Sequence, residues 1–117
     1  MPEIKSVSRG RTLWRECEVA DTAWKRFSGI MLRKRLDAPL LFVLPREGRM
    51  RAAIHSLFCI RFDAVFLDSG KAVVDLREDV HPWKFVIIPK RPAKYLIECA
   101  AGEAQKLGIT EGERLEF

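Results

Sequence analysis

A chain of 117 residues has room for one domain with one hydrophobic core. Its 48% hydrophobic and 32% charged residues are typical of a soluble globular protein, and no apolar run is long enough to span a bilayer, so no membrane partner is expected. The formal charge of +5 permits an acidic partner such as nucleic acid, although the surface of an ordinary soluble protein accounts for it more simply.

The cysteines and the first residues predict the cellular compartment of the protein. The three cysteines are odd in number and widely spaced, so we expect no disulfide framework and a reducing, cytoplasmic location (Cys17, Cys59 and Cys99). The first residues lack a basic segment leading into an apolar one, so no signal peptide is expected. Two isolated histidines do not make a metal site, and no motif indicates a cofactor.

The first twenty residues predict little more than one strand. Residues 1–10 are polar and predict either a loose lead-in or an edge strand. Residues 11–19 alternate between apolar and polar side chains, which is the pattern of a half-buried strand.

A short helix follows, with a cap at each end. Thr22, after Asp21, is placed as its N-cap, and Gly29 can end it in a left-handed conformation. Trp24 and Phe27 are three residues apart and therefore share a face, so we expect both to pack on the sheet as part of the core.

Residues 54–74 contain a nearly continuous run of β-branched and aromatic residues with a turn signal at 68–71. This pattern predicts a doubly buried strand and the first arm of a hairpin around which the core closes. Two charged residues, Arg61 and Asp63, interrupt the run. Because an ionised carboxylate is costly to bury, Asp63 needs a partner or a cavity.

The remaining apolar runs are short and are separated by proline or glycine. They predict strands at 40–44, 85–88, 95–99 and 114–117, and one or two helical turns within 102–107. Short strands at this spacing favour an antiparallel β-sandwich or a partly closed barrel with one or two short helices, formed by a single domain over residues 1–117.

Several segments occur in an order that is similar to a known family. They include Ile54-His55, the run from Phe62-Asp63 to Leu67-Asp68, and Pro82-Trp83, and the family's Glu-Leu-Pro-Ala-Gly segment corresponds to residues 98–102 here. From about Ala20 to Phe117 the chain resembles the uncharacterised proteins called domain of unknown function 192. The resemblance implies a mostly antiparallel, jelly-roll-like β domain, and it brings no established activity, cofactor or substrate.

Residues 54–74 also contain a candidate nucleophile, base and acid, but the spacing of these residues on a strand disfavours a catalytic site. His55, Cys59 and Asp63 are spaced by four residues, which on a strand places neighbours about 13 Å apart. That exceeds the reach of about 3 Å between a nucleophile and its base, so a packed, inert Cys59 and a structural His55 are the simpler interpretation.

Asp63 has two interpretations, either a brace or a pocket floor. As a brace it accepts backbone hydrogen bonds, and as a pocket floor, lined by His55 and Trp83, it binds a polar small molecule. Arg61 on the same strand face, or Arg33 from a basic cluster, would pair with it. Trp83 either stacks on a sugar or base ring or covers the open end of the core.

We therefore expect a small β domain that binds a small polar ligand or a protein partner without catalysis, with His55, Arg61, Asp63, Trp83 and Arg33 as candidate ligand-binding residues. One alternative is an enzyme that uses Asp63 and His55 as an acid-base pair. The other, less favoured, is a nucleic-acid-binding accessory protein that uses basic residues in three clusters (33–35, 46–51 and 84–94).

Overall fold

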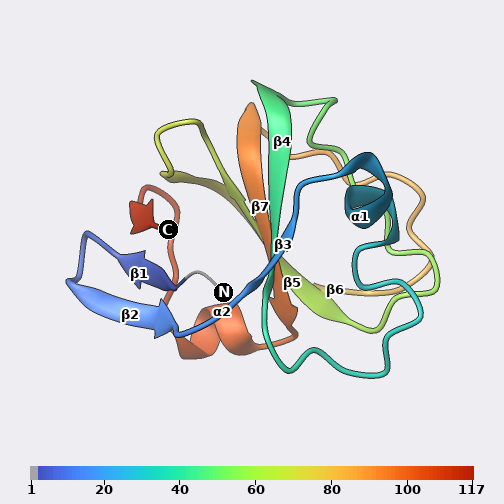
Figure 1. Ribbon diagram of the computed structural model, residues 1–117, viewed down its shortest axis with the longest axis horizontal. Coiled ribbons are helices and arrows are strands. Elements are labelled where there is room, and N and C mark those ends of the chain that lie inside the picture. Colours follow the sequence, from blue (N-terminus) through green and yellow to red (C-terminus); the bar gives the residue numbers. More distant parts are fainter. Residues whose placement is uncertain (1–2) are drawn as a thin grey trace.

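The computed structural model describes residues 3–117 and contains two β-sheets and two short helices (Figure 1). A three-stranded sheet has the order β2-β1-β8, and a five-stranded sheet has the order β3-β4-β7-β5-β6. The elements are β1 (Ile4–Ser6), β2 (Arg11–Trp14), β3 (Glu18–Ala20), α1 (Ala23–Ser28), β4 (Leu40–Gly48), β5 (Phe62–Leu67), β6 (Val73–Val80), β7 (Ala93–Ala100), α2 (Glu103–Lys106) and β8 (Leu115–Glu116).

The five-stranded sheet is covered on both faces. Strand pairs are antiparallel except for β3 and β4, which are parallel. In Figure 1 the small sheet and α2 lie on one side of the large sheet, and α1 with the long loops lies on the other. The prediction of a mainly β single domain with short helices is confirmed, and the sheets do not close into a barrel because the larger one ends at β3 and β6.

Strand parity divides the core into two clusters. Along β7, Leu96 faces the cluster under α1 and the loops, whereas Ile97 and Cys99 face the cluster under the small sheet and α2. β5 is buried along its whole length, as expected for a strand covered on both faces. The residue between Ile97 and Cys99 is Glu98, so its carboxyl points into the cluster under α1.

The N-terminal segment differs from its prediction. Ile4 is fully buried and β1 is the middle strand of the small sheet, neither a loose lead-in nor an edge strand. The single strand expected over residues 11–19 is two strands, β2 and β3, in different sheets. The chain leaves the small sheet after Trp14 and enters the large sheet at Glu18, which periodicity alone does not reveal.

The hairpin is present, but its first arm is shorter than predicted. β5 begins at Phe62, because a turn with a Cys59 N to Ser56 O hydrogen bond of 3.2 Å and a positive φ of 57° at Phe58 end any extended backbone before it. Asp68 closes the hairpin by accepting hydrogen bonds from the backbone of Gly70 and Ala72, each 3.0 Å long.

The helix forms where predicted, yet its aromatic residues do not enter the core. Thr22 caps α1, with its Oγ1 accepting a hydrogen bond of 3.1 Å from the backbone N–H of Lys25, and Gly29 has a φ of 44°. Trp24 and Phe27 are 70% and 57% exposed and stack on each other. The predicted strand at 85–88 is likewise absent: only Ile87 pairs, through an isolated bridge to Ile54, and Phe85 is 77% exposed.

Candidate functional site

A cavity of about 220 Å³ opens between α1 and the large sheet. Its apolar wall includes three deeply buried residues from different elements: Ile30 after α1, Phe42 on β4 and Leu96 on β7. Polar side chains also line it, namely Glu98, His55, Cys59, Arg26 and Arg51. We call this cavity the Glu98 pocket. An apolar cavity with a few polar groups is the usual form of a small-molecule site.

Glu98 is the unusual residue of the pocket. It lies on β7 opposite Leu40 on one side and Ala64 on the other, and it is only 4% exposed. No hydrogen bond or salt bridge of the described residues involves its carboxyl. Burial raises the pKa of Glu98 to about 8, and the nearby positive charge of Arg33 offsets this only in part. The carboxyl is therefore mainly protonated at neutral pH, and can donate as well as accept a hydrogen bond.

Gly29 keeps the space in front of Glu98 open. A Cβ at this position would lie 3.0 Å from Cζ of Phe42 and 3.5 Å from Oε1 of Glu98. Its positive φ of 44° also disfavours any other residue. Both the backbone and the space available therefore require glycine where the helix meets the pocket.

His55 lies at the side of the pocket and is held by two hydrogen bonds. Its Nδ1 accepts from the backbone N–H of Leu57 at 3.1 Å, and its Nε2 lies 3.1 Å from the carbonyl oxygen of Phe27. The neutral ring with hydrogen on Nε2 satisfies both contacts. His55 thereby ties the loop to the end of α1, and its ring also packs against Phe27 at a centroid distance of 5.4 Å.

Cys59 contributes a thiol to the pocket wall and is not activated as a nucleophile. Burial, with a further contribution from the charge of Glu98, raises its pKa to about 11. Reactive cysteines have a lowered pKa in a positive environment, and Cys59 has the opposite. All three cysteines are buried and free, as expected without a disulfide framework.

Asp63 is fully buried on the opposite face of the sheet and acts as a brace. Its Oδ1 accepts from the backbone N–H of Asp79 at 2.8 Å, and its Oδ2 accepts from Gly102 at 3.0 Å and Ala104 at 2.9 Å. The carboxylate thus joins β5, β6 and the start of α2. It does not line the Glu98 pocket, so the structure does not bring Asp63 and His55 together.

The two arginines expected beside Asp63 pair elsewhere. Arg61 forms a bidentate ion pair with Asp79 on the surface. Arg33 contacts Glu18 at 2.8 Å and acts on Glu98 only through its charge. The expectation that either arginine would pair with Asp63 is wrong: three backbone N–H groups stabilise its carboxylate instead.

Trp83 projects from a loop and covers neither the core nor the Glu98 pocket. It is 59% exposed, has a φ of 71°, and packs edge-on against Phe58 with the ring centroids 4.8 Å apart. Both loops are anchored by the buried Ser56, whose hydroxyl donates to the carbonyl of His81 and accepts from the N–H of Lys84, each at 2.8 Å.

The basic clusters do not form one uninterrupted positive face. Within the three clusters, Arg33 pairs with Glu18, Arg35 with Asp37 and Lys90 with Glu111. Among residues 3–117, no group of three metal-ligating side chains could hold a metal ion. Nor does any helix in that range have the length and apolar character needed to cross a membrane.

The sequence-based prediction centred the ligand site on Asp63 of β5 and did not include Glu98 of β7. A signal was present: a glutamate between isoleucine and cysteine within a buried strand is as anomalous as Asp63. Both acids stand in segments that carry the family resemblance, but only tertiary structure separates their roles. Asp63 meets backbone donors, whereas Glu98 meets a cavity.

Comparison with known proteins identifies the family. The family model DUF192, described as "Uncharacterized ACR", matches residues 4–117. A UPF0127 protein of Pyrococcus furiosus is 43% identical over 113 residues, which cover 96% of this chain and 95% of the relative. One of Thermococcus sibiricus is 38% identical over 111 residues, covering 94% of this chain and 71% of the relative.

Two solved structures have a similar fold. A protein of Sinorhizobium meliloti, named as a candidate transcription regulator, aligns with a TM-score of 0.85 and 25% identity over 97% of this chain and 89% of its own. A protein of unknown function from Novosphingobium aromaticivorans aligns with a TM-score of 0.84 and 21% identity over 98% of this chain and 82% of its own, which shows the fold alone. Given the family match and these relatives, the chain belongs to the DUF192 family of uncharacterised proteins.

Proposed function

We propose that this protein binds a small molecule in the Glu98 pocket and does not catalyse a reaction on it. The ligand has an apolar body and one polar group that exchanges a hydrogen bond with the carboxyl of Glu98. The observation that carries the proposal is the Glu98 carboxyl, which makes no hydrogen bond to the described residues and borders a cavity of about 220 Å³.

A ligand in the pocket has to replace the hydrogen bonds that water makes to the Glu98 carboxyl. A polar group that loses water without gaining a hydrogen bond costs about 1–3 kcal/mol. A ligand that fills the pocket and bonds the Glu98 carboxyl avoids this cost, and the apolar wall adds the contribution of burying the ligand's own apolar surface. A purely structural glutamate would instead be paired, as Asp63 and Glu113 are.

Two alternatives have less support. An acid-base pair of Asp63 and His55 would require both groups at one spot, yet they lie on opposite sides of the large sheet. A role on nucleic acid, to which the name of the Sinorhizobium meliloti neighbour points, would require a continuous basic surface, whereas many arginines here are paired with acids. A cytoplasmic location, favoured by three free cysteines, and the jelly-roll topology remain predictions.

The test is a thermal-shift screen of small alcohols, amides, carboxylic acids and amines, followed by the same screen on Glu98→Leu. A specific ligand should raise the melting temperature of the native protein, and the stabilisation should grow with the logarithm of its concentration once this exceeds Kd. The Glu98→Leu variant should be at least as stable without ligand and should lose the shift. A matched control, Glu78→Leu on the exposed face of β6, should keep it. A ligand whose shift survives in Glu98→Leu would place binding elsewhere.

A further inference from the structure

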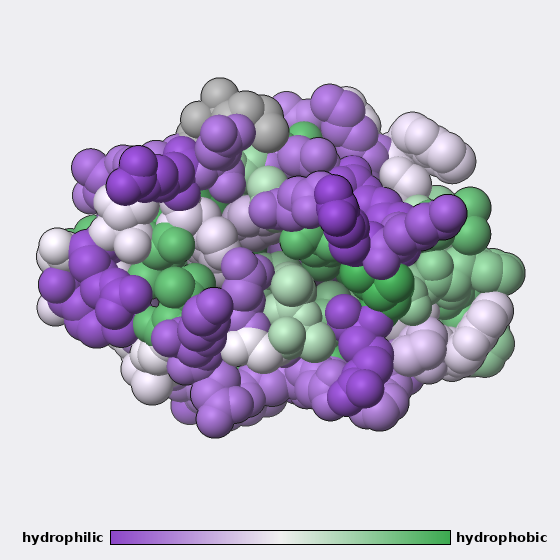
Figure 2. Space-filling model, turned by 90° about the horizontal axis from the view of Figure 1, so that it is seen from below, coloured by the Kyte–Doolittle hydropathy of each residue, from purple (hydrophilic) through white to green (hydrophobic). Residues whose placement is uncertain are grey.

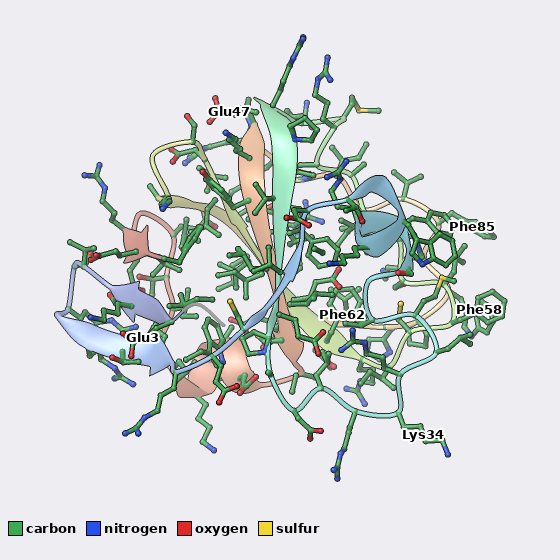
Figure 3. All side chains as sticks on the ribbon, in the orientation of Figure 1. Glu3, Lys34, Glu47, Phe58, Phe62 and Phe85 are labelled. Atoms are coloured by element: carbon green, nitrogen blue, oxygen red, sulfur yellow. The ribbon has the colours of Figure 1, made fainter. Side chains whose placement is uncertain are left out.

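One end of the molecule exposes an unusual number of large apolar side chains. Phe58 and Phe85 point away from the sheet at the same end of the long axis in Figure 3, and apolar residues gather at the corresponding end in Figure 2. We call this region the aromatic surface; it comprises Trp24, Phe27, Leu32, Phe58, Trp83, Phe85 and Val86, which are between 53% and 77% exposed. Soluble monomers rarely gather exposed apolar residues in this way without an interaction.

The backbone holds these side chains outward at a cost in strain. Three of the seven, Leu32, Phe58 and Trp83, have φ values of 64°, 57° and 71°. Bulky residues rarely occupy this region unless surrounding contacts fix them. Those contacts exist: the N–H of Leu32 donates to the carbonyl of Phe58 at 2.8 Å, and that of Trp83 donates to Ser56 at 3.1 Å. The fold therefore presents the aromatic surface as a fixed feature.

Lysines alternate with the apolar residues of this surface. Lys25 follows Trp24, Lys84 lies between Trp83 and Phe85, and Lys34 extends from the lower edge of the same half of the molecule (Figure 3). All three lysines are exposed, and none forms a salt bridge among the described residues. Two arginines of the neighbouring segments are paired with acids, Arg33 with Glu18 and Arg61 with Asp79. The three lysines therefore supply positive charge beside the aromatic side chains.

We propose that the aromatic surface binds peripherally to an anionic membrane surface, with the aromatic tips in the interface and the lysines at the lipid phosphates. Tryptophan and phenylalanine side chains bordered by lysine are the composition of interfacial membrane contacts. Of its seven residues, Phe27 lines the Glu98 pocket and Val86 lines a mainly polar depression beside β6, whereas the other five line neither. A planar bilayer fits such a surface better than a peptide, which requires a groove or a free strand edge.

This inference is independent of the Glu98 pocket, and it departs from the expectation of no membrane partner. That expectation rested on the absence of a long apolar run. Interfacial binding needs no such run, because it uses side chains that the fold collects from four separate segments: α1, Leu32, Phe58 and the 83–86 loop.

The fluorescence of the exposed tryptophans can be used to test this proposal. Trp24 and Trp83 are 70% and 59% exposed, whereas Trp14 is 7% exposed in the small sheet. Vesicles of phosphatidylcholine with phosphatidylglycerol should shift the tryptophan emission to the blue and carry the protein into the pellet on centrifugation. Vesicles of phosphatidylcholine alone should do so weakly, and added salt should weaken binding to the anionic vesicles.

Variants separate the contribution of the aromatic side chains to vesicle binding from that of the lysine charges. Phe58→Asn with Phe85→Ser removes two aromatic tips, and asparagine tolerates the positive φ of residue 58. Lys25→Gln, Lys34→Gln and Lys84→Gln together remove the charge. Each set should weaken vesicle binding by about tenfold or more. The matched controls, Val7→Ser in the turn after β1 and Lys106→Gln in α2, should bind as the native chain does.

Three outcomes would overturn the proposal. The first is no association of the native chain with anionic vesicles. The second is association that survives loss of the aromatic tips, which would indicate a general attraction of a basic protein. The third is a native dimer, measured by light scattering, that Phe58→Asn with Phe85→Ser converts to a monomer while vesicles bind neither form. That result would assign the surface to contact between two copies.

Discussion

Oδ2 of Asp63 lies 2.9 Å from the backbone nitrogen of Ala104, and through this contact a residue of the central strand fixes the start of a helix 41 positions later. The same oxygen accepts from Gly102, and the other oxygen accepts from Asp79. One carboxylate therefore satisfies three backbone donors that would otherwise be left without partners on the covered face of the sheet.

Replacing Asp63 by asparagine should destabilise the fold without affecting the Glu98 pocket. The amide nitrogen cannot accept a hydrogen bond, so at least one backbone N–H loses its partner and the charge-assisted bonds weaken. We expect the free energy of unfolding to fall by about 2–4 kcal/mol. Urea unfolding followed by circular dichroism measures this. Asp37→Asn, on the surface, should change stability by less than about 0.5 kcal/mol, and an equal loss in both variants would contradict the brace.

Glu98 should make stability fall as the pH rises. Its pKa is raised from an ordinary 4.5 to about 8 in the folded protein, so the folded state retains a proton that the unfolded state releases. The stabilisation from the protonated form is complete below pH 4.5 and is lost on going up through pH 8, with a slope approaching about 1.4 kcal/mol per pH unit inside that window.

The Glu98→Gln variant should remove this slope, because glutamine does not titrate. Urea midpoints of the native chain and the variant, measured from pH 4 to pH 9, should diverge steadily above pH 4.5 in favour of the variant. Glu78→Gln on the exposed part of β6 provides the control and should follow the native chain. Parallel curves for native chain and Glu98→Gln would show that the carboxyl titrates normally.

Cys59 should react slowly with thiol reagents despite lining a cavity. Because burial and Glu98 raise its pKa to about 11, only a small fraction is thiolate at pH 8. In a chain with Cys17→Ala and Cys99→Ala, iodoacetamide should modify Cys59 at least about tenfold more slowly in the folded state than in urea, as mass spectrometry can measure. Equal rates in the two states would indicate an activated thiol.

Glu113 joins the two ends of the chain and should matter most at neutral pH. Although burial opposes ionisation, hydrogen bonds from Ser6 and Arg9 hold the pKa of Glu113 below its ordinary value. Its contribution to stability is therefore present at neutral pH and is lost as the pH falls through its lowered pKa.

Ser6→Ala should lower the free energy of unfolding at pH 7 by about 1–2 kcal/mol, because one donor to the buried carboxylate is removed. The difference from the native chain should shrink in acid, where Glu113 becomes protonated. Ser69→Ala, in the exposed hairpin turn, is the matched control. A difference that stays constant from pH 7 to pH 3 would show that the hydroxyl acts through packing.

The sequence by itself determined the fold class and much of the chain's local structure. The buried apolar run, the Thr22 cap and the 68–71 turn placed the hairpin and α1 correctly, although β5 begins later than predicted, because turns and caps depend on neighbours a few residues apart. The oddity of an acid inside an apolar run was likewise visible at Asp63. Tertiary structure alone decided which acid meets donors and which meets a cavity, since Gly102 and Ala104 reach Asp63 from 39 and 41 positions away. It also decided that Phe85 and Trp83 remain in solvent, because apolar character selects a residue for burial only where the fold supplies a partner surface.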